Sequence, residues 1–242
     1  MITLSDVQVK FDQLTIFDHL QLEFESNKTH VLLGPSGCGK TTILRLISGL
    51  LKPTKGEIFL DDKNITQIEQ KDRSSLLGFM VQEGGLFPHL TIRDNILLPG
   101  ILHKKDLTCL KTRLKELVEM VQLDPLHLNR YPIELSGGQK QRAALIRALI
   151  LDPPVLLMDE PMSALDPLVR MSLQKSLKVV FNELKKTVIL VTHSLNEASF
   201  FAHETYLLNS GKIEQRGSFE EILKNPATEF ARDFINSQVP LV

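Results

Sequence analysis

An eight-residue run with glycines at fixed places and a lysine near its end has the composition of a phosphate-binding loop. The run is Gly34-Pro35-Ser36-Gly37-Cys38-Gly39-Lys40-Thr41. It follows a short apolar segment at 31–33 and precedes a helical pattern at 42–49. Glycines let the backbone curl so that successive N–H groups face a phosphate chain, aided by the helix N-terminus. Because the pattern stands in its required strand–loop–helix context, a mere glycine-rich turn with a surface lysine is the weaker interpretation.

Individual residues of this loop have distinct expected roles. Lys40 should reach the β- and γ-phosphates, where it is catalytic, and the Thr41 hydroxyl is placed to ligate Mg²⁺. Cys38 lies beside Lys40 at a helix N-terminus, where positive potential favours a reactive thiolate that Mg-ATP would protect from a maleimide. The alternative is that Cys38 is only a small residue at a variable position. The predicted nucleotide-binding residues here are Gly34, Pro35, Ser36, Gly37, Cys38, Gly39, Lys40, Thr41 and Thr42.

Two adjacent carboxylates follow an apolar run further along the chain. Residues 155–158 are Val-Leu-Leu-Met and end in Asp159-Glu160. The carboxyl edge of an open α/β sheet is where ligands bind. Asp159 is suited to holding Mg²⁺, and Glu160 to orienting and activating an attacking water. An acidic pair alone would mean little, but with the loop upstream it predicts a nucleotide hydrolase that uses Mg²⁺.

A third motif is the run Leu135-Ser136-Gly137-Gly138-Gln139, which opens a helix that continues to Leu149. A serine and two glycines at a helix start offer a hydroxyl and exposed N–H groups to a second anion. The motif therefore predicts contact with a second anion at Ser136, Gly137, Gly138 and Gln139.

The elements that must position these motifs alternate along the chain. Apolar runs at 31–33, 79–81, 155–158 and 188–191 are typical of buried strands separated by helices, which indicates α/β order with a mostly parallel sheet. The segments 4–9 and 20–24 instead predict paired antiparallel strands. The expected fold class is thus an α/β P-loop NTPase core with an N-terminal antiparallel β subdomain.

Residues from about 88 to 150 are expected to form a helical subdomain inserted in the core of one domain, 1–242. Apolar residues there recur at three- and four-residue steps, which predicts an amphipathic helix: they are Leu107, Leu110, Leu114, Leu117, Val118 and Val121. The alternative is that these helices simply cover one face of the sheet. Later helix starts are predicted at Asp166-Pro167 and at Asn225-Pro226, each an N-cap followed by proline.

Composition excludes several classes of protein. The 242 residues carry 28 Lys and Arg against 29 Asp and Glu, so the net charge of −1 gives no basic excess for nucleic acid. Two cysteines provide no disulfide framework or zinc spacing. No apolar stretch is long enough to span a membrane, and no signal peptide is expected.

Taken with the first two motifs, Ser136–Gln139 makes the sequence resemble the ATP-binding subunit of an ATP-binding cassette (ABC) transporter over nearly the whole chain. The resemblance implies that Phe11 stacks on adenine and that Gln82 senses Mg²⁺ and the membrane partner. It matches the run Ser163-Ala164-Leu165-Asp166 to the D-loop, so that Asp166 contacts nucleotide, and His193 to the catalytic switch histidine. Phe11 as an ordinary core aromatic and His193 as a buried, satisfied histidine are the alternatives.

The resemblance also implies partners. Two subunits pack head to tail, so that Ser136 and Gly138 act on the ATP held by the other copy. Dimer closure would push on separate permease subunits through a groove lined by Gln82 and the helical subdomain. The expected place is the cytoplasmic face of the inner membrane, with an extracytoplasmic solute-binding protein as a further partner and no nucleic acid.

The expected substrate is an osmoprotectant or quaternary amine such as glycine betaine or choline. The runs 131–134, 158–161 and 217–227 resemble importers of that subfamily, whereas Met162-Ser163 departs from it and is similar to amino-acid importers. The end at Val242 leaves no room for the regulatory domains of many such subunits, so regulation through them is not expected. An amino-acid importer, a lipid or lipoprotein exporter and a non-transport ABC ATPase are the alternatives.

Overall fold

The computed structural model describes residues 1–163 and 165–238, which fold into two compact units. The first unit combines residues 1–73 with the described part of 187–242, and the second comprises the described part of 74–186. Helix α2 (Gln70–Leu76) contains the point where the chain passes from the first unit to the second. The limits expected for the helical subdomain, 88 and 150, fall inside the second unit and stay a prediction.

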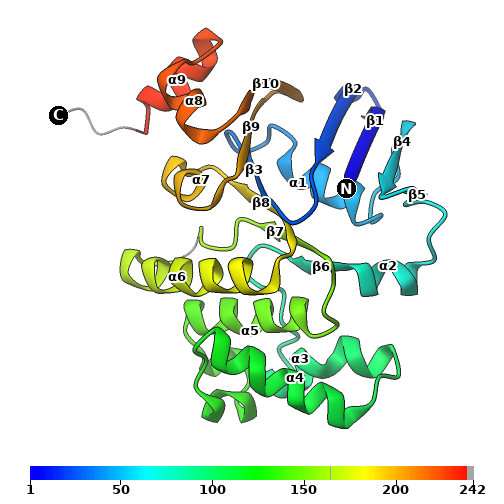
Figure 1. Ribbon diagram of the computed structural model, residues 1–242, viewed down its shortest axis with the longest axis vertical. Helices are drawn as coiled ribbons and strands as arrows, with labels where there is room; N and C mark the ends of the chain where they lie inside the picture. Colours follow the sequence, from blue (N-terminus) through cyan, green and yellow to red (C-terminus); the bar gives the residue numbers. More distant parts are fainter. Residues whose placement is uncertain (164, 239–242) are drawn as a thin grey trace. The chain divides into compact units, whose positions relative to one another are not determined.

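An antiparallel sheet of the first unit contains the N-terminal strands (Figure 1). Its order is β2-β1-β4-β5, with β1 at Ile2–Phe11, β2 at Leu14–Phe24, β4 at Lys55–Leu60 and β5 at Lys63–Asn64. Leu4 pairs with Leu22 and Val7 with Leu20. All four of these side chains are buried: Leu20 and Leu22 are alternate residues of β2 and share one face, and the register shift in β1 between Leu4 and Val7 lets both of these residues face the same side. The predicted pairing of 4–9 with 20–24 is confirmed.

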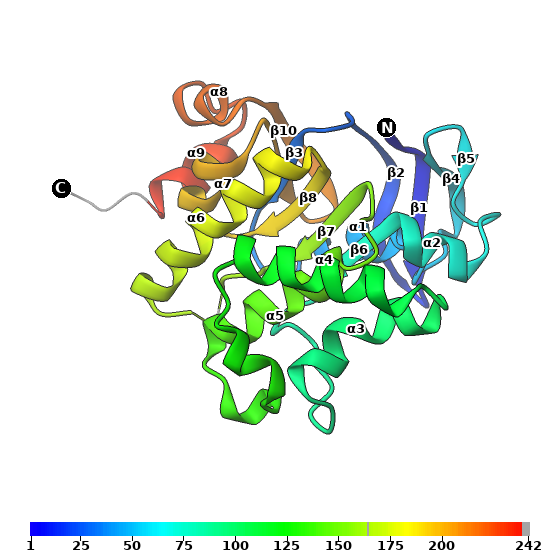
Figure 2. The same cartoon turned by 60° about the horizontal axis from the view of Figure 1, so that its bottom comes forward.

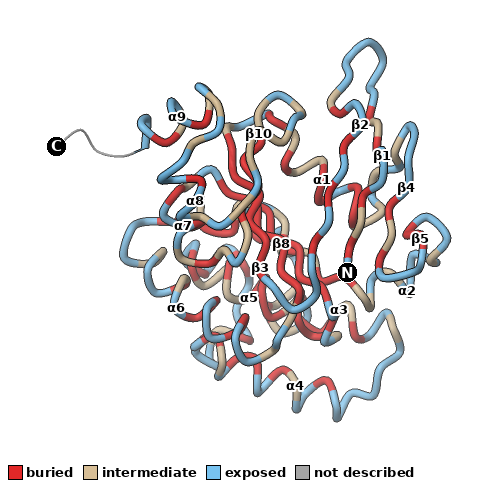
Figure 3. Tube along the Cα trace, turned by 45° about the horizontal axis from the view of Figure 1, so that its top comes forward, coloured by how far each residue is buried: buried red, intermediate tan, exposed pale blue. Residues whose placement is uncertain are grey.

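Parallel strands form the buried centre of the first unit. Strand β3 (Thr29–Leu33) lies between β8 (Thr187–Thr192) and β9 (Glu204–Asn209), and β10 (Lys212–Gly217) pairs antiparallel with β9. Every residue of β3 and β8 is buried, and both strands run as continuous buried tubes in Figure 3. Leu33 is in register with Thr192, so the segments after β3 and β8 leave the same edge of the sheet.

The second unit has a parallel pair of its own, β6 (Leu77–Met80) and β7 (Val155–Asp159). Met80 is in register with Met158, so the residues that follow both strands also share an edge. The strand predicted at 79–81 begins earlier than expected and leaves Val81 outside it. Parallel strands together with an antiparallel N-terminal sheet confirm the predicted α/β class.

Helices make up most of the second unit and lie side by side in Figure 2. They are α3 (Ile92–Leu102), α4 (Leu107–Met120), α5 (Gly137–Leu149) and α6 (Pro167–Leu184), with 3₁₀ turns at Pro125–Asn129 and Pro132–Glu134. Residues 88–150 contain no strand, as predicted. The expected apolar face of α4 is buried except at Leu107, which is 55% exposed because it begins the helix and lies outside its packed turns. Asp166 caps α6 ahead of Pro167, as expected, by accepting from the N–H groups of the first turn.

Two predicted helix boundaries differ in the first unit. Helix α1 spans Lys40–Ile47 rather than 42–49, since the helix starts directly from the glycine loop. Asn225 does not start a helix. It ends α8 (Phe219–Lys224), and α9 (Glu229–Asn236) is capped instead by Thr228. The side chain of Gln215 explains the difference, because its amide bonds the Asn225 carbonyl and the Ala227 N–H and so holds 225–227 out of helical geometry. The remaining helix of this unit is α7 (Leu195–Phe201).

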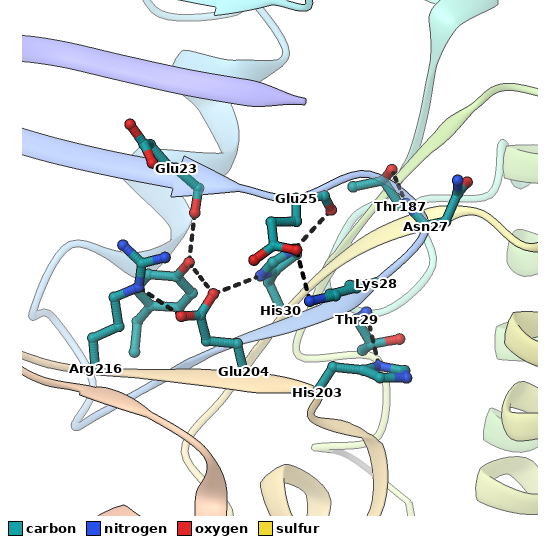
Figure 4. Close-up of polar contacts among 11 residues, drawn as sticks. Glu23, Glu25, Asn27, Lys28, Thr29, His30, Thr187, His203, Glu204 and Arg216 are labelled. Carbon is teal, nitrogen blue, oxygen red and sulfur yellow. Dashed lines mark hydrogen bonds and ion pairs between the residues drawn. The ribbon is translucent and has the colours of Figure 1, made fainter.

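A polar network lies at the amino end of β3, around the fully buried His30 (Figure 4). The His30 Nε2 donates to the Glu25 carbonyl at 2.9 Å, and Nδ1 lies 3.4 Å from the carboxylate of Glu204. That carboxylate also accepts from Tyr206 at 2.6 Å and from Arg216 at 2.6 Å. Burial lowers the pKa of His30, because desolvation of the imidazolium outweighs the two oxygen neighbours.

This depressed pKa predicts a pH dependence of stability. The folded pKa of His30 lies below the unfolded value of about 6.5, so the unfolded chain takes up the proton first as the pH falls. Stability is therefore full above the unfolded pKa and is lost on acidification toward the folded pKa. We expect His30→Gln, which can keep the bond to Glu25, to lose less unfolding free energy than wild type between about pH 7.5 and about pH 5.5. Denaturant titrations at several pH values measure this.

His19 supplies the control for that prediction. It is exposed, and its hydrogen bond to Asp6 raises its pKa, which is the opposite sign. The variant His19→Asn should not reduce the loss of unfolding free energy that accompanies acidification. Equal pH profiles for wild type and His30→Gln would show that His30 does not carry the effect.

None of the helices in the described part of the chain has the length and apolarity needed to cross a bilayer.

Candidate functional site

The glycine loop follows β3 and is shaped by close contacts on both sides. Gly34 has φ +153° and Gly39 has φ +107°. A Cβ at Gly34 would lie 2.3 Å from the carbonyl oxygen of Leu208, and one at Gly39 would lie 2.5 Å from the ring of Phe17. Only glycine fits at these two positions, in both conformation and space. The loop is thus fixed between β9 and β2 of its own unit.

The first turn of α1 presents its N–H groups at the end of this loop. Gly39 is the N-cap and supplies no side-chain oxygen to those N–H groups. Lys40 is only 4% exposed, and its Nζ donates to the carbonyls of Gly34 at 2.8 Å and Pro35 at 2.7 Å. The loop therefore curls around a buried ammonium group. A helix N-terminus without a capping side chain, beside a lysine, favours binding of a phosphate.

Cys38 does not have the reactivity predicted from its sequence position. Its side chain is buried, 5% exposed, with Sγ 3.8 Å from the Lys40 Nζ. Burial raises the pKa of the Cys38 thiol, and the opposing effect of Lys40 is smaller. The expectation of a reactive thiolate that labels in the empty protein is therefore wrong, because desolvation outweighs the positive potential. The alternative, a small residue filling the loop, agrees with the structure.

A maleimide should accordingly discriminate between the two cysteines. Cys109 is exposed on α4, whereas Cys38 is buried. We expect Cys38 to react at least about tenfold more slowly than Cys109 at neutral pH, because both access and thiolate are reduced. Peptide mapping by mass spectrometry measures the two rates. Rapid labelling at Cys38 in a folded protein would contradict both its burial and its raised pKa, and Cys38→Ser identifies the peptide.

The first unit also contains Phe11 and His193. Phe11 ends β1 and is 49% exposed, so it is not an ordinary core aromatic. His193 directly follows β8 and is exposed, so it is not a buried histidine. Because β3 and β8 are parallel and in register, Gly34 and His193 leave the same edge of the sheet. The roles of both side chains stay predictions.

The second unit brings Gln82 and the two carboxylates to one edge. Asp159 ends β7 and is 6% exposed, while Glu160 follows it with φ +43° and is half-buried. Gln82 follows the neighbouring parallel strand β6 and is exposed. The donor atoms expected for Mg²⁺, from Thr41, Gln82 and Asp159, are all oxygens, which suits this ion. Among the described residues, no group of three or more His, Cys, Asp and Glu side chains is arranged so that it could hold a metal ion.

A surface pocket of about 400 Å³ opens beside Gln82 within the second unit. Its wall combines an acidic, a basic and several apolar side chains, and Ile133 is 87% exposed. The lining residues are Gln82, Glu83, Gly85, Leu86, Pro88, Pro132, Ile133 and Lys140. Apart from Gln82, these were not expected site residues, because the sequence does not reveal that Ile133 is exposed.

Ser136 is the N-cap of α5, at the helix start expected for the third motif, and its contact with a second anion stays a prediction. Its Oγ accepts from the Gln139 N–H at 3.4 Å, and the Gln139 Oε1 accepts from the Ser136 N–H at 2.8 Å. Ser136 and Gly137 are exposed. Gly138 is buried, and a Cβ there would lie 2.2 Å from Val169, so glycine is required for α5 to approach α6.

In this structure the side chain of Asp166 caps the N-terminus of α6. Its Oδ1 accepts from the N–H groups of Leu168 at 3.1 Å and Val169 at 3.0 Å. A contact of Asp166 with nucleotide stays a prediction. Ala164, in the same expected motif, lies outside the described residues.

The sequence of the chain also shows to which family it belongs. The sequence profile of the ABC transporter family matches residues 17–163. The chain belongs to the ABC transporter family.

The relatives of this chain include several ATP-binding proteins of transporters. It is 43% identical over 90% of its length to the glycine betaine/carnitine/choline transport ATP-binding protein OpuCA of Bacillus subtilis, of which it covers 58%. It is 42% identical over 95% of its length to the osmoprotectant import ATP-binding protein OsmV of Salmonella typhimurium, covering 60%. The chain thus spans a little over half the length of these relatives. A probable sulfate/thiosulfate import ATP-binding protein CysA of Chlorella vulgaris is 39% identical, with 97% of this chain and 98% of that protein covered.

A solved structure agrees with the fold. The dimeric, post-hydrolysis ATP-binding cassette MJ0796 bound to ADP and Pi superposes with a TM-score of 0.81 at 32% identity, covering 90% of this chain and 99% of that one.

Proposed function

We propose that this chain is the ATP-hydrolysing subunit of a membrane transporter and powers import through separate permease subunits. The observation that carries the proposal is the glycine loop, which leads into a helix N-terminus without a capping side chain and encloses the buried ammonium group of Lys40. ATP would bind there through its phosphates. Phe11, exposed at the end of β1, would stack on the adenine.

Catalysis would consist mainly of positioning and charge stabilisation, as is general for phosphoryl transfer. Lys40 turns from the loop carbonyls to the β- and γ-phosphates. Glu160 orients the attacking water and accepts its proton, and His193 contacts the γ-phosphate. Mg²⁺, held by Thr41, Gln82 and Asp159, would neutralise charge on the phosphate oxygens when bound.

A second copy would complete each site. Ser136 and Gly137 are exposed at the start of α5, so they are available to the nucleotide of another subunit. The dimeric cassette with ADP and Pi, which has the same fold, supports this arrangement. Asp166 would also contact the nucleotide in this dimer.

The permease would dock at the pocket beside Gln82, where the exposed Ile133 offers apolar contact area and Glu83 and Lys140 offer charge. The chain would then act as a peripheral subunit at the cytoplasmic face of the membrane. An extracytoplasmic solute-binding protein would deliver the substrate.

For the substrate we favour an osmoprotectant such as glycine betaine, choline or carnitine, because OpuCA and OsmV are similar over most of this chain. Uptake of radiolabelled glycine betaine by cells lacking this chain tests the proposal. Wild-type chain should restore uptake, and Glu160→Gln should not. Restored uptake of sulfate or an amino acid instead would overturn the substrate, and unchanged uptake of all of them would overturn import.

A further inference from the structure

The three residues after Gln82 follow an unusual backbone path. Glu83, Gly84 and Gly85 have φ of +59°, +79° and +56°. The Gly84 N–H donates to the carbonyl of Val81 at 3.0 Å, and a Cβ at Gly85 would lie 2.5 Å from the Val81 side chain. Glycine adopts positive φ readily, but this conformation is costly at Glu83 and persists there only when neighbouring groups hold it.

One side chain of α5 holds this path. Arg147 Nη2 donates to the carbonyl of Gly84 and Nη1 to that of Gly85, both at 2.8 Å. Ala144, one turn earlier on the same face of α5, lies against Gly84, where a Cβ would be 3.1 Å away. The loop after Gln82 therefore lies along a stripe of α5, fixed at its end by two charge-assisted hydrogen bonds.

The same helix carries Ser136 at its start. Helix α5 is continuous from Gly137 to Leu149, so any displacement of its first turn is transmitted along it to Arg147. We infer that Arg147 is a positioning residue that fixes the loop after Gln82 and couples it mechanically to the helix beginning at Ser136. The inference rests on the proposed function for the roles of Gln82 and Ser136, whereas the effect on the loop does not depend on it.

Arginine suits this task better than lysine. The planar guanidinium presents two N–H groups at fixed spacing to two successive carbonyls, whereas an ammonium is a point charge on a flexible stem. Partial burial of Arg147 costs solvation, and the two bonds offset that cost. Lysine at this position should therefore hold one carbonyl at a time and restrain the loop only in part.

Hydrogen exchange measured by mass spectrometry tests the effect on the loop. We expect Arg147→Met to speed exchange of amides in residues 82–87 by about tenfold, since two bonds to a charged group are lost. Arg147→Lys should give an intermediate rate. Arg113→Met is the matched control, because it removes another arginine of the same unit, paired with Asp152 and Glu116, without touching this loop.

Steady-state kinetics test the coupling. Arg147→Met should lower kcat for ATP about tenfold and leave KM within about twofold, with Arg147→Lys in between, because the loop and not the phosphate site is altered. Unchanged exchange in Arg147→Met, or fast exchange with unchanged kcat, would overturn the inference. If the wild-type chain has no ATPase activity, the proposed function fails instead, and the exchange result still decides whether Arg147 fixes the loop.

Discussion

Glu160→Gln is expected to reduce ATP turnover by about 10²–10⁴-fold while ATP binding persists. The replacement keeps the size of the side chain and removes the carboxylate that would accept a proton from the attacking water. Glu160 directly follows the buried strand β7, so its backbone is fixed and a neutral amide should occupy the same place. Because product formation stops after binding, a dimer with ATP trapped in it should accumulate, visible by size-exclusion chromatography with labelled nucleotide.

A glutamate outside the candidate site controls for the loss of charge. Glu183 is exposed near the end of α6, and Glu183→Gln should turn over ATP at about the wild-type rate, since exposed substitutions rarely perturb a site. Turnover by Glu160→Gln near the wild-type rate would refute the catalytic role of Glu160.

The second large effect is expected in mixed dimers. If Ser136 serves the nucleotide of the other copy, a dimer of one Lys40→Ala and one Ser136→Arg subunit retains a single intact site. Each homodimer of these variants has a defect in both sites. We expect the mixed dimer to occlude nucleotide and the homodimers to lose it almost completely, because Lys40 and the Ser136 hydroxyl act on the same phosphates from different chains.

Occlusion is measured with labelled ATP on tagged, separately purified dimers, with Glu160→Gln added to every subunit to prevent turnover. Equal occlusion in the mixed dimer and in the Lys40→Ala homodimer would show that the sites are not shared. A Ser136→Ala subunit in place of Ser136→Arg distinguishes loss of the hydroxyl from the bulk of the arginine.

Local sequence patterns were sufficient to predict most of the strands and helix starts. The buried strands at β3, β7 and β8 read as continuous apolar runs because both faces are covered, and Asp166-Pro167 starts a helix through local hydrogen bonds alone. Asn225-Pro226 has the same local pattern and fails, because a side chain from the distant Gln215 fixes that backbone. Such competition between local and long-range contacts is not visible in a window of sequence.

In the candidate site, too, contacts between residues distant in the sequence could not be predicted. The glycine spacing predicted the loop, but the charge state of Cys38 depends on burial, which sequence neighbours do not reveal. Arg147 was read only as part of a helix, since its role comes from carbonyls at Gly84 and Gly85, sixty-odd positions away in the chain. The signal that was available in the sequence was the pair of glycines at 84 and 85, which follows Gln82 and Glu83.

Steady-state release of phosphate from Mg-ATP by the purified chain, measured over a range of protein concentrations, is the most direct test of the proposed ATPase. We expect saturable release whose rate per chain rises with protein concentration, since two copies are needed for each site, and its loss in Lys40→Ala. A folded protein that releases no phosphate at any concentration, or whose release is unchanged in Lys40→Ala, would contradict ATP hydrolysis at this loop.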